Sequence, residues 1–450
     1  MTSVIRQFAQ QNNGIQIDAN SVSVIEGPQE FYQTLLTCIR GSSKRITLST
    51  LYIGDGELEK HLIDEIHIRQ KACGQLRVNI LLDYLRGTRG LTSGTSSVTV
   101  LQKLLPSSSV HLYHTPNLRG VLKQLLPERV NEIVGLQHLK LYIFDDDVII
   151  SGANLSDSYF TNRQDRYIII KNTPELAEFC CSLIDAVSSC SFLLKSDNTL
   201  ETDPRCSIHP FKGNLHEYKE LVHQRVKSVL SRLNVNEQKC FVNKHGDTVV
   251  YPLVQMGLFD VNMEYDFLKE LFASQEHCLS ITLTSGYFNF TEEYGKLITH
   301  SGNYPMNIIY ASPQANGFHK GSGFSRYIPS IYVVISEFFY RSTRSGVRLF
   351  EYERPGWTYH AKGLWIDSNA SSLFASLVGS SNYGYRSVHR DLEMSMLLVT
   401  SNEKLKKELR LEHARLKEWT FPVQFATFLR PDHRVPLWIK LVSKYIRNFF

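Results

Sequence analysis

The sequence predicts an α/β fold of two tandem domains, each built on a mixed sheet flanked by helices, that form one shared active site. Short apolar segments typical of strands alternate with helical patterns along the chain, as in layered α/β domains. The order of these segments occurs twice, once in residues 1–200 and again in residues 214–450. A chain of 450 residues is also too long for one ordinary hydrophobic core, which favours two domains.

The first half begins with a helical pattern over Gln29–Arg40, which precedes a strand of sequence ITLSTLY that starts at Ile46. A helix from Glu57, a buried strand over Val78–Leu82 and a strand over Val110–Tyr113 are expected next. The second half repeats this order with a helix over Tyr265–Ser274, a strand over Ile281–Tyr287, a helix from Thr291, and strands over Met306–Tyr310 and Val347–Phe350. The repeat predicts that both halves have the same architecture.

A polar stretch with two prolines, Ser196–Gly213, predicts the boundary between the halves. Asn214–Leu233 then predicts a helix that leads into the second half. The first domain is therefore expected over residues 1–200 and the second over residues 214–450.

One motif occurs at the same place in both halves. It has the form H-x-K-x-x-x-x-D, and its copies are His138, Lys140 and Asp145 in the first half and His360, Lys362 and Asp367 in the second. An asparagine follows each copy, with an acid eleven residues further on: Asn154 with Asp165, and Asn382 with Glu393. Either His-Lys pair alone is compatible with a structural histidine in a sheet. The doubling, with its matched asparagine and acid, indicates catalysis.

The segment HLKLYIF favours a strand because it is rich in apolar and aromatic residues. Alternate residues of a strand share a face, so His138 and Lys140 are expected to point the same way. Asp145 stands an odd number of residues later, inside an acidic turn, which predicts a brace at the turn rather than a group in the same pocket. The return strand, VIISGAN, would then deliver Asn154.

This set of side chains suits phosphoryl chemistry. Ammonium and amide groups hold non-bridging phosphate oxygens, and an imidazole held by a carboxylate can attack phosphorus or carry a proton. With two such sets face to face, one histidine can attack while the other protonates the leaving oxygen. The lysines supply the positive charge, so neither a metal ion nor another cofactor is expected.

The paired motifs resemble those of the phospholipase D superfamily, in which two H-K-D motifs meet at one active site. Longer strings narrow the resemblance, which runs from about Val22 to Phe450, to the eukaryotic mitochondrial phosphatidylglycerophosphate synthases. These strings are GLQHLKLYIFD, SGANLSDSYFTNRQDRY, WTYHAKGLW and NYGYRSVHRDLE. The resemblance implies two tandem phospholipase D-like domains and the first committed step toward phosphatidylglycerol and cardiolipin.

The implied reaction is a two-step transfer from CDP-diacylglycerol to glycerol 3-phosphate with release of CMP. By family analogy His138 is the nucleophile, and His360 is the acid and later the base. Lys140, Lys362, Asn154 and Asn382 would bind the phosphate, and Asp165 and Glu393 would orient the histidines. Glu393 is a mild departure from the family pattern, which has an aspartate at this acidic position.

The resemblance also implies peripheral attachment to the matrix side of the mitochondrial inner membrane. No apolar run is long enough to span a bilayer. The N-terminus, MTSVIRQFAQQNN, is too poor in arginine for a transit peptide, so a targeting segment is expected to be absent from this sequence. The net charge of +5 fits an anionic membrane surface and gives little support for the basic groove of a nuclease, so no nucleic-acid partner is expected. Eight cysteines without metal-binding spacing predict reduced thiols.

Two segments are candidates for membrane contact. Residues 116–136, an insertion that the second half lacks, place an apolar stripe beside cations, and the end of the chain, VPLWIKLVSKYIRNFF, predicts a basic amphipathic helix. For each segment the alternative is a helix packed against its own domain, since amphipathic helices commonly cover a core.

Arginines flank the segments between each asparagine and its acid. A guanidinium binds phosphate bidentately, so these arginines are candidates for holding glycerol 3-phosphate, with Arg386 the first choice; the alternative is surface salt bridges. The full set is Arg163, Arg166, Arg386 and Arg390. Asp83 and Arg86, at a strand end, are candidates for contact with the cytidine or its phosphate.

Three other functions fit the motif alone. A hydrolase of the same superfamily, either a phospholipase or a nuclease, would use water as the acceptor, and another phospholipid synthase would use another alcohol. A scaffold that binds lipid without catalysis would carry the site as a relic, which the intact histidines and lysines argue against. The longer strings favour the phosphatidyltransferase.

Overall fold

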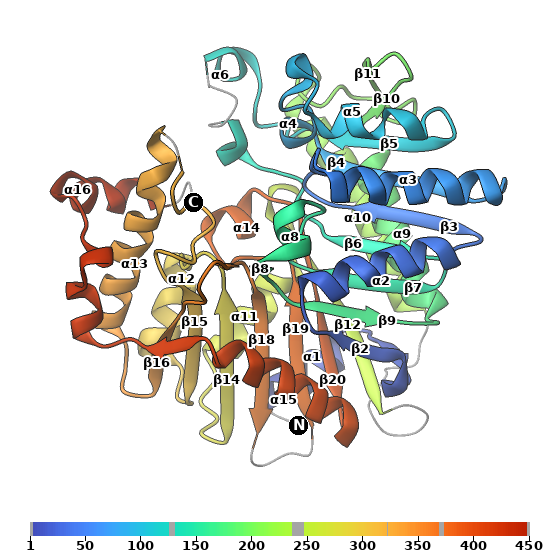
Figure 1. Cartoon of the computed structure of the whole chain (residues 1–450). Coiled ribbons are helices and arrows are strands. Elements are labelled where there is room, and N and C mark those ends of the chain that lie inside the picture. The colour runs from blue at the N-terminus through green and yellow to red at the C-terminus, as the bar shows by residue number, and fades with distance from the viewer. Residues whose placement is uncertain (1–2, 126–130, 236–246, 322, 369–372, 448–450) are drawn as a thin grey trace.

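The computed structural model describes residues 3–125, 131–235, 247–321, 323–368 and 373–447 (Figure 1). It consists of two sheets flanked by helices, one in each half of the chain. The predicted α/β architecture is therefore confirmed.

The first sheet has the strand order β11-β10-β5-β4-β3-β6-β7-β9-β2. Its strands are β2 (Val22–Ile25), β3 (Arg45–Ser49), β4 (Arg77–Asp83), β5 (Ser108–Tyr113), β6 (Leu141–Phe144), β7 (Asp147–Ser151), β9 (Tyr167–Ile170), β10 (Phe192–Leu194) and β11 (Leu200–Thr202). The helices of this half are α2 (Pro28–Gly41), α3 (Glu57–Ala72), α4 (Tyr84–Gly87), α5 (Ser97–Leu101), α6 (Gly120–Leu125), α8 (Asp157–Thr161) and α9 (Pro174–Ser188).

The second sheet has the order β1-β12-β20-β19-β18-β14-β15-β16-β21, and β13 pairs with β12. Its strands are β1 (Ile15–Ile17), β12 (Thr248–Met256), β13 (Val261–Asn262), β14 (Leu279–Ser285), β15 (Met306–Ala311), β16 (Val347–Tyr352), β18 (Lys362–Ser368), β19 (Phe374–Gly379), β20 (Glu393–Thr400) and β21 (Thr420–Pro422). The helices are α1 (Ser3–Gln11), α10 (Leu215–Val235), α11 (Met263–Phe272), α12 (Glu292–Lys296), α13 (Ile328–Ser342), α14 (Tyr385–His389), α15 (Glu403–Lys417) and α16 (Leu437–Ile446).

The two sheets repeat one topology. Strands β5, β4 and β3 are parallel neighbours, and β6, β7 and β9 continue the sheet in antiparallel fashion. Strands β16, β15, β14, β18, β19 and β20 follow the same pattern. The central strands are buried along almost their whole length, which matches their continuous apolar sequences.

One hydrophobic cluster spans both halves. It includes Leu141 and Ile168 of the first sheet and Val254 and Leu398 of the second, together with the buried sides of α9 and α10. Two further clusters lie under the outer helices, one in each half. Because the shared core joins the two sheets, the elements that carry the motifs have fixed relative positions.

The start of the chain packs on the second half rather than the first. Strand β1 pairs with β12 of the second sheet, and Ile5 and Phe8 of α1 lie in the core of the second half. The expected first domain, residues 1–200, therefore differs from the structure at its beginning. A strand of three residues and a helix of nine carry no sequence signal of which half they join.

None of the helices in the described part of the chain is long and apolar enough to cross a bilayer. Every cysteine in that part is a free thiol.

Candidate active site

The segments that carry the motifs of one half pair with the acid-bearing segments of the other. The short strands β8 (Arg163–Gln164) and β17 (Thr358–Tyr359) run parallel between the halves. The His360 amide donates to the carbonyl of Gln164 at 2.8 Å, and the His138 amide donates to the carbonyl of Leu392 at 2.9 Å. Both histidines thus stand just before strands β18 and β6, rather than inside the strands as predicted.

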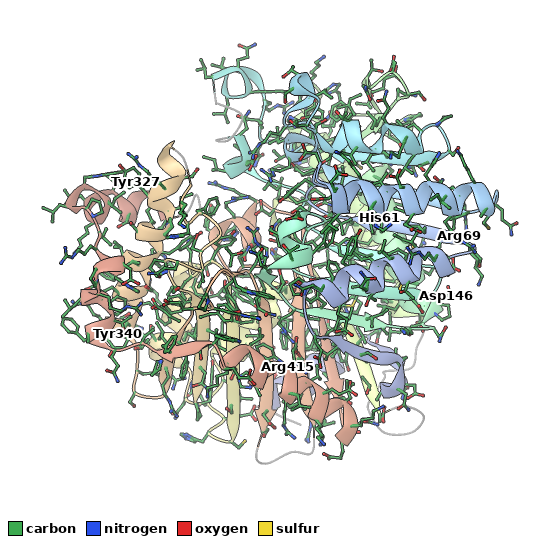
Figure 2. The ribbon with its side chains drawn as sticks, in the orientation of Figure 1. His61, Arg69, Asp146, Tyr327, Tyr340 and Arg415 are labelled. Atoms are coloured by element: carbon green, nitrogen blue, oxygen red, sulfur yellow. The ribbon has the colours of Figure 1, made fainter. Side chains whose placement is uncertain are left out.

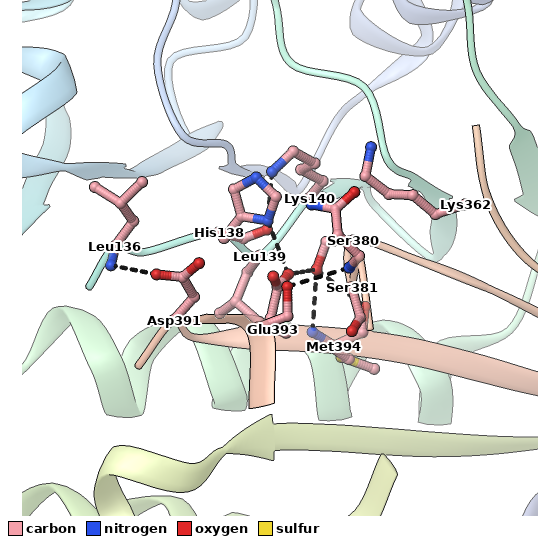
Figure 3. A network of polar contacts seen from close by, with 12 residues as sticks. Leu136, His138, Leu139, Lys140, Lys362, Ser380, Ser381, Asp391, Glu393 and Met394 are labelled. Atoms are coloured by element: carbon pink, nitrogen blue, oxygen red, sulfur yellow. Dashed lines mark hydrogen bonds and ion pairs between the residues drawn. The ribbon is translucent and has the colours of Figure 1, made fainter. Parts of the chain in front are cut away.

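Each imidazole is held by the acid of the opposite half. His138 Nδ1 lies 2.9 Å from Glu393 Oε2, and His360 Nδ1 lies 2.7 Å from Asp165 Oδ2. All four side chains are buried. In Figure 3, Glu393 lies below His138 and also accepts a hydrogen bond from the Ser380 hydroxyl, which is itself bonded to the Met394 amide.

Burial lowers the pKa of both histidines. For His138 the charge of Lys140 lowers the pKa further, while Glu393 opposes the shift. The pKa of His360 falls well below its ordinary value because of burial, Lys362 and Arg163. Both imidazoles are therefore neutral near pH 7, which is the form that can attack or accept a proton.

The two lysines bring positive charge to the same place. Burial lowers the pKa of Lys140 to about 7 and that of Lys362 to about 8. Each lysine also lies close enough to both acids for Glu393 and Asp165 to favour its charged form. Their ammonium groups donate to the carbonyls of His138 and His360 at 3.0 and 2.6 Å.

The acids differ in their protonation. Burial raises the pKa of Asp165 to about 6, although Lys362 opposes this. Burial would also raise the pKa of Glu393, but His138, Lys140 and Ser380 hold it below its ordinary value. Glu393 therefore stays ionised against His138, and Asp165 titrates close to the physiological range.

The asparagines lie beside this cluster in different settings. Asn154 donates from Nδ2 to the Tyr159 hydroxyl at 3.1 Å, and Tyr159 in turn lies 3.2 Å from His360 Nε2. Asn382 Oδ1 is buried without a hydrogen-bond partner among the described residues. An unpaired buried amide oxygen costs free energy unless a ligand satisfies it.

The last residues of the two motifs lie outside the cluster. Asp145 has φ of 51° and accepts hydrogen bonds from the amides of Ser43, Lys44 and Arg45 at the start of β3. Asp367 pairs with Arg410 at 2.8 Å on α15. Both carboxylates belong to the repeated motif, yet they make their contacts at the turn end of their hairpins and not beside the histidines.

The candidate arginines differ in whether a carboxylate pairs with them. Arg166 is fully buried and makes a bidentate pair with Glu412, Arg386 pairs with Asp391 at 3.3 Å, and Arg390 donates to the carbonyl of Ile133 at 2.9 Å. Arg163 donates through Nε to Thr358 Oγ1 and has no ion pair with a described carboxylate.

The predicted cytidine-contact residues make contacts within the protein. Asp83 is buried and accepts from the amides of Arg86 and Gln137, and burial raises its pKa to about 7. Arg86 stacks on Tyr52 at 4.3 Å and lies 3.7 Å from Glu132. Asp83 thus fixes the main chain one residue before His138.

Three residues near the histidines were not named individually as site residues from the sequence. Tyr159 and Tyr287 flank His360 edge-on, with ring centroids 5.1 and 5.5 Å away, and Glu264 is buried near Glu393. Tyr287 occupies the same position in ITLTSGY as Tyr52 in ITLSTLY, so the repeat held a signal for that residue. Tyr159 and Glu264 have no matched partner in the other half.

No group of three or more His, Cys, Asp and Glu side chains in the described residues is arranged to hold a metal ion. The site residues form a set of two neutral imidazoles, two ammonium groups and two acids. Such a set is suited to transfer of a phosphoryl-type group between two oxygen atoms.

Comparison with known proteins narrows the transfer reaction. No protein-family model matches the chain. The mitochondrial CDP-diacylglycerol–glycerol-3-phosphate 3-phosphatidyltransferase of Gallus gallus is 40% identical over 471 residues, which covers 96% of this chain and 84% of that protein. The protein of the same name from Homo sapiens is 38% identical over 467 residues, with the same coverage.

Among solved structures, the phosphatidylserine synthase of Haemophilus influenzae has a TM-score of 0.72 at 20% sequence identity and covers 99% of both chains. That likeness shows the fold. The match to the phosphatidyltransferases covers 96% of this chain. The chain therefore belongs to the family of the CDP-diacylglycerol–glycerol-3-phosphate 3-phosphatidyltransferases.

Proposed function

We propose that this phosphatidyltransferase moves the phosphatidyl group of CDP-diacylglycerol to glycerol 3-phosphate through a covalent phosphatidyl-histidine. One observation carries the proposal: each of two buried imidazoles is held through Nδ1 by the acid of the opposite half, with a lysine beside it. A carboxylate that accepts the Nδ1 proton leaves the lone pair on Nε2, which is the atom that must react.

In the first step His138 Nε2 attacks the phosphorus on the diacylglycerol side. A P–N bond forms, the P–O bond to CMP breaks, and the electron pair leaves with CMP. His138 suits this role because its Nε2 has no hydrogen-bond partner among the described residues, whereas Nε2 of His360 contacts Tyr159 and Lys362. The non-bridging oxygens are held by Lys140, Lys362, Asn154 and Asn382.

In the second step His360 removes the proton from a primary hydroxyl of glycerol 3-phosphate. The new P–O bond forms while the P–N bond to His138 breaks, and the bond's electron pair returns to His138 Nε2. His360 then releases its proton to solvent, which regenerates the free enzyme. The departing oxygen of CMP belongs to a phosphate whose second pKa is about 6, so it needs little help from an acid. The lowered pKa of His360 therefore favours its role as a base over its role as an acid.

The test is incubation with CDP-diacylglycerol, with and without glycerol 3-phosphate, for the wild type and for His138→Ala and His360→Ala. We expect His138→Ala to lower transfer by at least about 10³-fold and His360→Ala by about 10²–10⁴-fold. His216→Ala, at an exposed position of α10, is the matched control and should leave transfer unchanged. Radiolabelled phosphatidyl that stays on His360→Ala after denaturation in detergent at mildly alkaline pH, where the P–N bond survives, would identify the covalent intermediate, and full activity of either catalytic variant would refute it.

We also propose that the enzyme contacts the anionic membrane surface peripherally, on the matrix side of the mitochondrial inner membrane. Both predicted segments expose apolar side chains. In α6, Val121 and Leu125 are 67% and 74% exposed. In α16, Leu437 and Leu441 are 80% and 74% exposed, and the buried Ile439 packs inward instead.

Helix α6 lies at the top of the view in Figure 1, on the first half, and α16 lies at the left edge, on the second half. Helix α16 packs against α13. The ring of Tyr327, the residue just before α13, contacts the ring of Trp438 with centroids 4.9 Å apart, and Figure 2 labels Tyr327 at this edge of the molecule. Exposed leucines beside lysine, with no acid on α16, are typical of helices that lie in a membrane interface. Lys123, a cation of the insertion, makes a contact within the protein: its ammonium nitrogen lies 3.2 Å from the centroid of the Phe211 ring.

Replacing the exposed Leu437 and Leu441 with serine tests this proposal and leaves the buried Ile439 in place. We expect the Leu437→Ser/Leu441→Ser variant to bind less to vesicles that contain anionic lipid, while its thermal unfolding is unchanged. Leu411→Ser is the control, because Leu411 is also exposed, at 47%, but belongs to α15, which lies at the bottom of the view in Figure 1, away from α16. Equal vesicle binding by both variants would refute the assignment of α16.

A further inference from the structure

The two halves of the repeat carry opposite charges at one matched position, two residues before the acid that orients a histidine. Arg163 stands two residues before Asp165, and Asp391 stands two residues before Glu393. The same position in the repeat therefore carries a cation next to His360 and an anion on the side of His138. Tyr159, five residues after Asn154, is likewise replaced by Ser387, five residues after Asn382. The two sides of the site are built for different ligands.

Arg163 lies within a ring of tyrosines. Its guanidinium carbon is 4.6 Å from the centroid of Tyr159. Burial raises the pKa of Tyr159 and Tyr287, so their hydroxyls stay protonated and neutral beside it. A Cβ built at Gly317 would lie 3.1 Å from the Tyr287 hydroxyl and 3.6 Å from Arg163 Nη2, so the main chain at Gly317 also passes close to this cluster.

The guanidinium of Arg163 has no carboxylate partner among the described residues. Its Nε donates to Thr358 Oγ1 at 3.0 Å, and this bond orients the outer nitrogens. Of the other candidate arginines, Arg166 pairs with Glu412, Arg386 with Asp391 and Arg86 with Glu132. Arg390 donates to the carbonyl of Ile133 at 2.9 Å. An oriented guanidinium that makes no ion pair with a carboxylate is suited to bidentate binding of a phosphate.

We propose that Arg163, with the hydroxyls of Tyr159 and Tyr287, forms the subsite for the phosphate group of glycerol 3-phosphate. This inference rests on the proposed function and deepens it. An in-line displacement places the acceptor on the side opposite the attacking His138, which is the side of His360. A phosphate held by Arg163 brings the far hydroxyl of the three-carbon acceptor toward His360 Nε2, and a plain alcohol gains no such hold.

The subsite predicts how the enzyme distinguishes glycerol 3-phosphate from glycerol. The test compares kcat/KM for the two acceptors in the wild type, Arg163→Gln, Arg163→Lys and the control Arg348→Gln, whose side chain is exposed on β16. We expect Arg163→Gln to lower the preference for glycerol 3-phosphate at least tenfold, in line with the loss of a charged hydrogen bond worth about 1.5–3 kcal/mol. Arg163→Lys should lower it less, and Arg348→Gln should not change it.

A second variant keeps the proposal testable if Arg163→Gln fails to fold. Thr358→Val removes only the bond to Nε, so it should lower the same preference by a smaller factor while the guanidinium remains. An equal loss with both acceptors in Arg163→Gln would mean that Arg163 is merely structural. An unchanged preference with weaker inhibition by CMP would assign the subsite to CMP, and both results overturn the proposal. A wild-type enzyme that releases CMP without esterifying glycerol 3-phosphate would instead refute the proposed function.

Discussion

The two histidines must be neutral when CDP-diacylglycerol arrives, because a protonated imidazole cannot attack phosphorus. Burial, Lys140 and Lys362 all favour the neutral forms. Glu393 and Asp165 offset part of the cost of burying these cations, and they keep the lysines partly charged. Residues of opposite charge therefore set one another's protonation across the boundary between the halves.

This arrangement predicts the acid limb of the pH–activity profile. The pKa of His138 is lowered, so its neutral form persists below its ordinary value of 6.5, and Asp165 becomes protonated at about pH 6. We expect kcat/KM to stay level as the pH falls to about 6.5 and to decline only below that. The measurement is initial-rate transfer between about pH 5 and 8, and a midpoint above pH 7 would show that the imidazoles are not held neutral.

Glu264 offers a prediction about stability. It is buried in the first turn of α11, and its carboxylate oxygens have no hydrogen-bond partner among the described residues. Burial and the charge of Glu393 raise its pKa to about 8 from an ordinary 4.5, so the folded protein keeps this proton at pH values where the unfolded chain has lost it. The resulting contribution to stability falls by about 1.4 kcal/mol per pH unit as the pH rises from 4.5 toward 8.

Glu264→Gln cannot ionise and should abolish that pH dependence. Urea unfolding at about pH 5 and about pH 8 should show the variant gaining stability over the wild type at the higher pH. Glu217→Gln, at an exposed position in the first turn of α10, is the control. A difference between wild type and Glu264→Gln that does not change with pH would contradict a protonated Glu264.

The repeated motif allowed the sequence to reveal both histidines, both lysines and their acids. It could not reveal that the acids cross between the halves, because each acid follows its own motif along the chain. Nor could it reveal that Asp391 would pair with Arg386 while Arg163 has no carboxylate partner among the described residues. Those pairings depend on how the two sheets pack, which no local pattern records.

At the scale of elements, strand β18, which begins at Lys362, approaches the first half of the chain very closely. Gly363, which follows Lys362 at the start of β18, has φ of 132°, a conformation that favours glycine. A Cβ at this position would collide with the Arg166 guanidinium and the carbonyl oxygen of Leu377. The glycine therefore lets the strand pass against the side chain that follows Asp165.

Gly363→Ala should cost about 3 kcal/mol or more, since backbone strain and a steric clash add. Gly356→Ala separates the two effects, because Gly356 also has positive φ, 76°, but no atom lies within 4 Å of the place that its added methyl group would occupy. Only strain, about 1 kcal/mol, is expected there. Equal losses of urea stability in the two variants would show that the approach of Arg166 does not matter.

The strands next to the motifs were predictable because their apolar runs are long and repeated. The strand β6 nevertheless begins at Leu141, three residues after His138, because the His138 amide bonds to Leu392 of the other half. The ribbon of β8 and β17 has two residues in each strand, too few for any periodic signal. The outward face of α16 was one of two alternatives that amphipathicity alone leaves open.

For the whole molecule, the central question is what holds the two halves in register. Arg166 leaves the first half next to Asp165 and inserts into the second. It binds Glu412 through two hydrogen bonds, Ser376 Oγ at 2.7 Å and the Leu377 carbonyl at 2.8 Å, and it stacks on Trp365 at 3.9 Å. Any displacement of Arg166 therefore also displaces the acid that orients His360.

A double-mutant cycle tests this link. Glu412→Leu alone leaves a buried guanidinium without its charge partner, and Arg166→Met alone leaves the Glu412 carboxylate without its own. Each single variant should cost about 3–5 kcal/mol of stability. Arg166→Met/Glu412→Leu removes both charges and should recover much of that loss. Recovery should be incomplete, because Trp365 Nε1 donates to Glu412 Oε2 at 3.0 Å and would lose its acceptor.

The matched control is a second ion pair between the same halves, Arg415 with Glu26 at 2.6 Å. Arg415, which Figure 2 labels, belongs to the same helix as Glu412. The side chains of this control pair are 36% and 66% exposed, so solvent screens it, and its removal should cost at most about 1 kcal/mol. If the two cycles gave equal coupling energies, Arg166 would be one contact among many. If only the buried pair couples, and transfer activity falls with it, the register of the halves and the orientation of His360 depend on the same guanidinium.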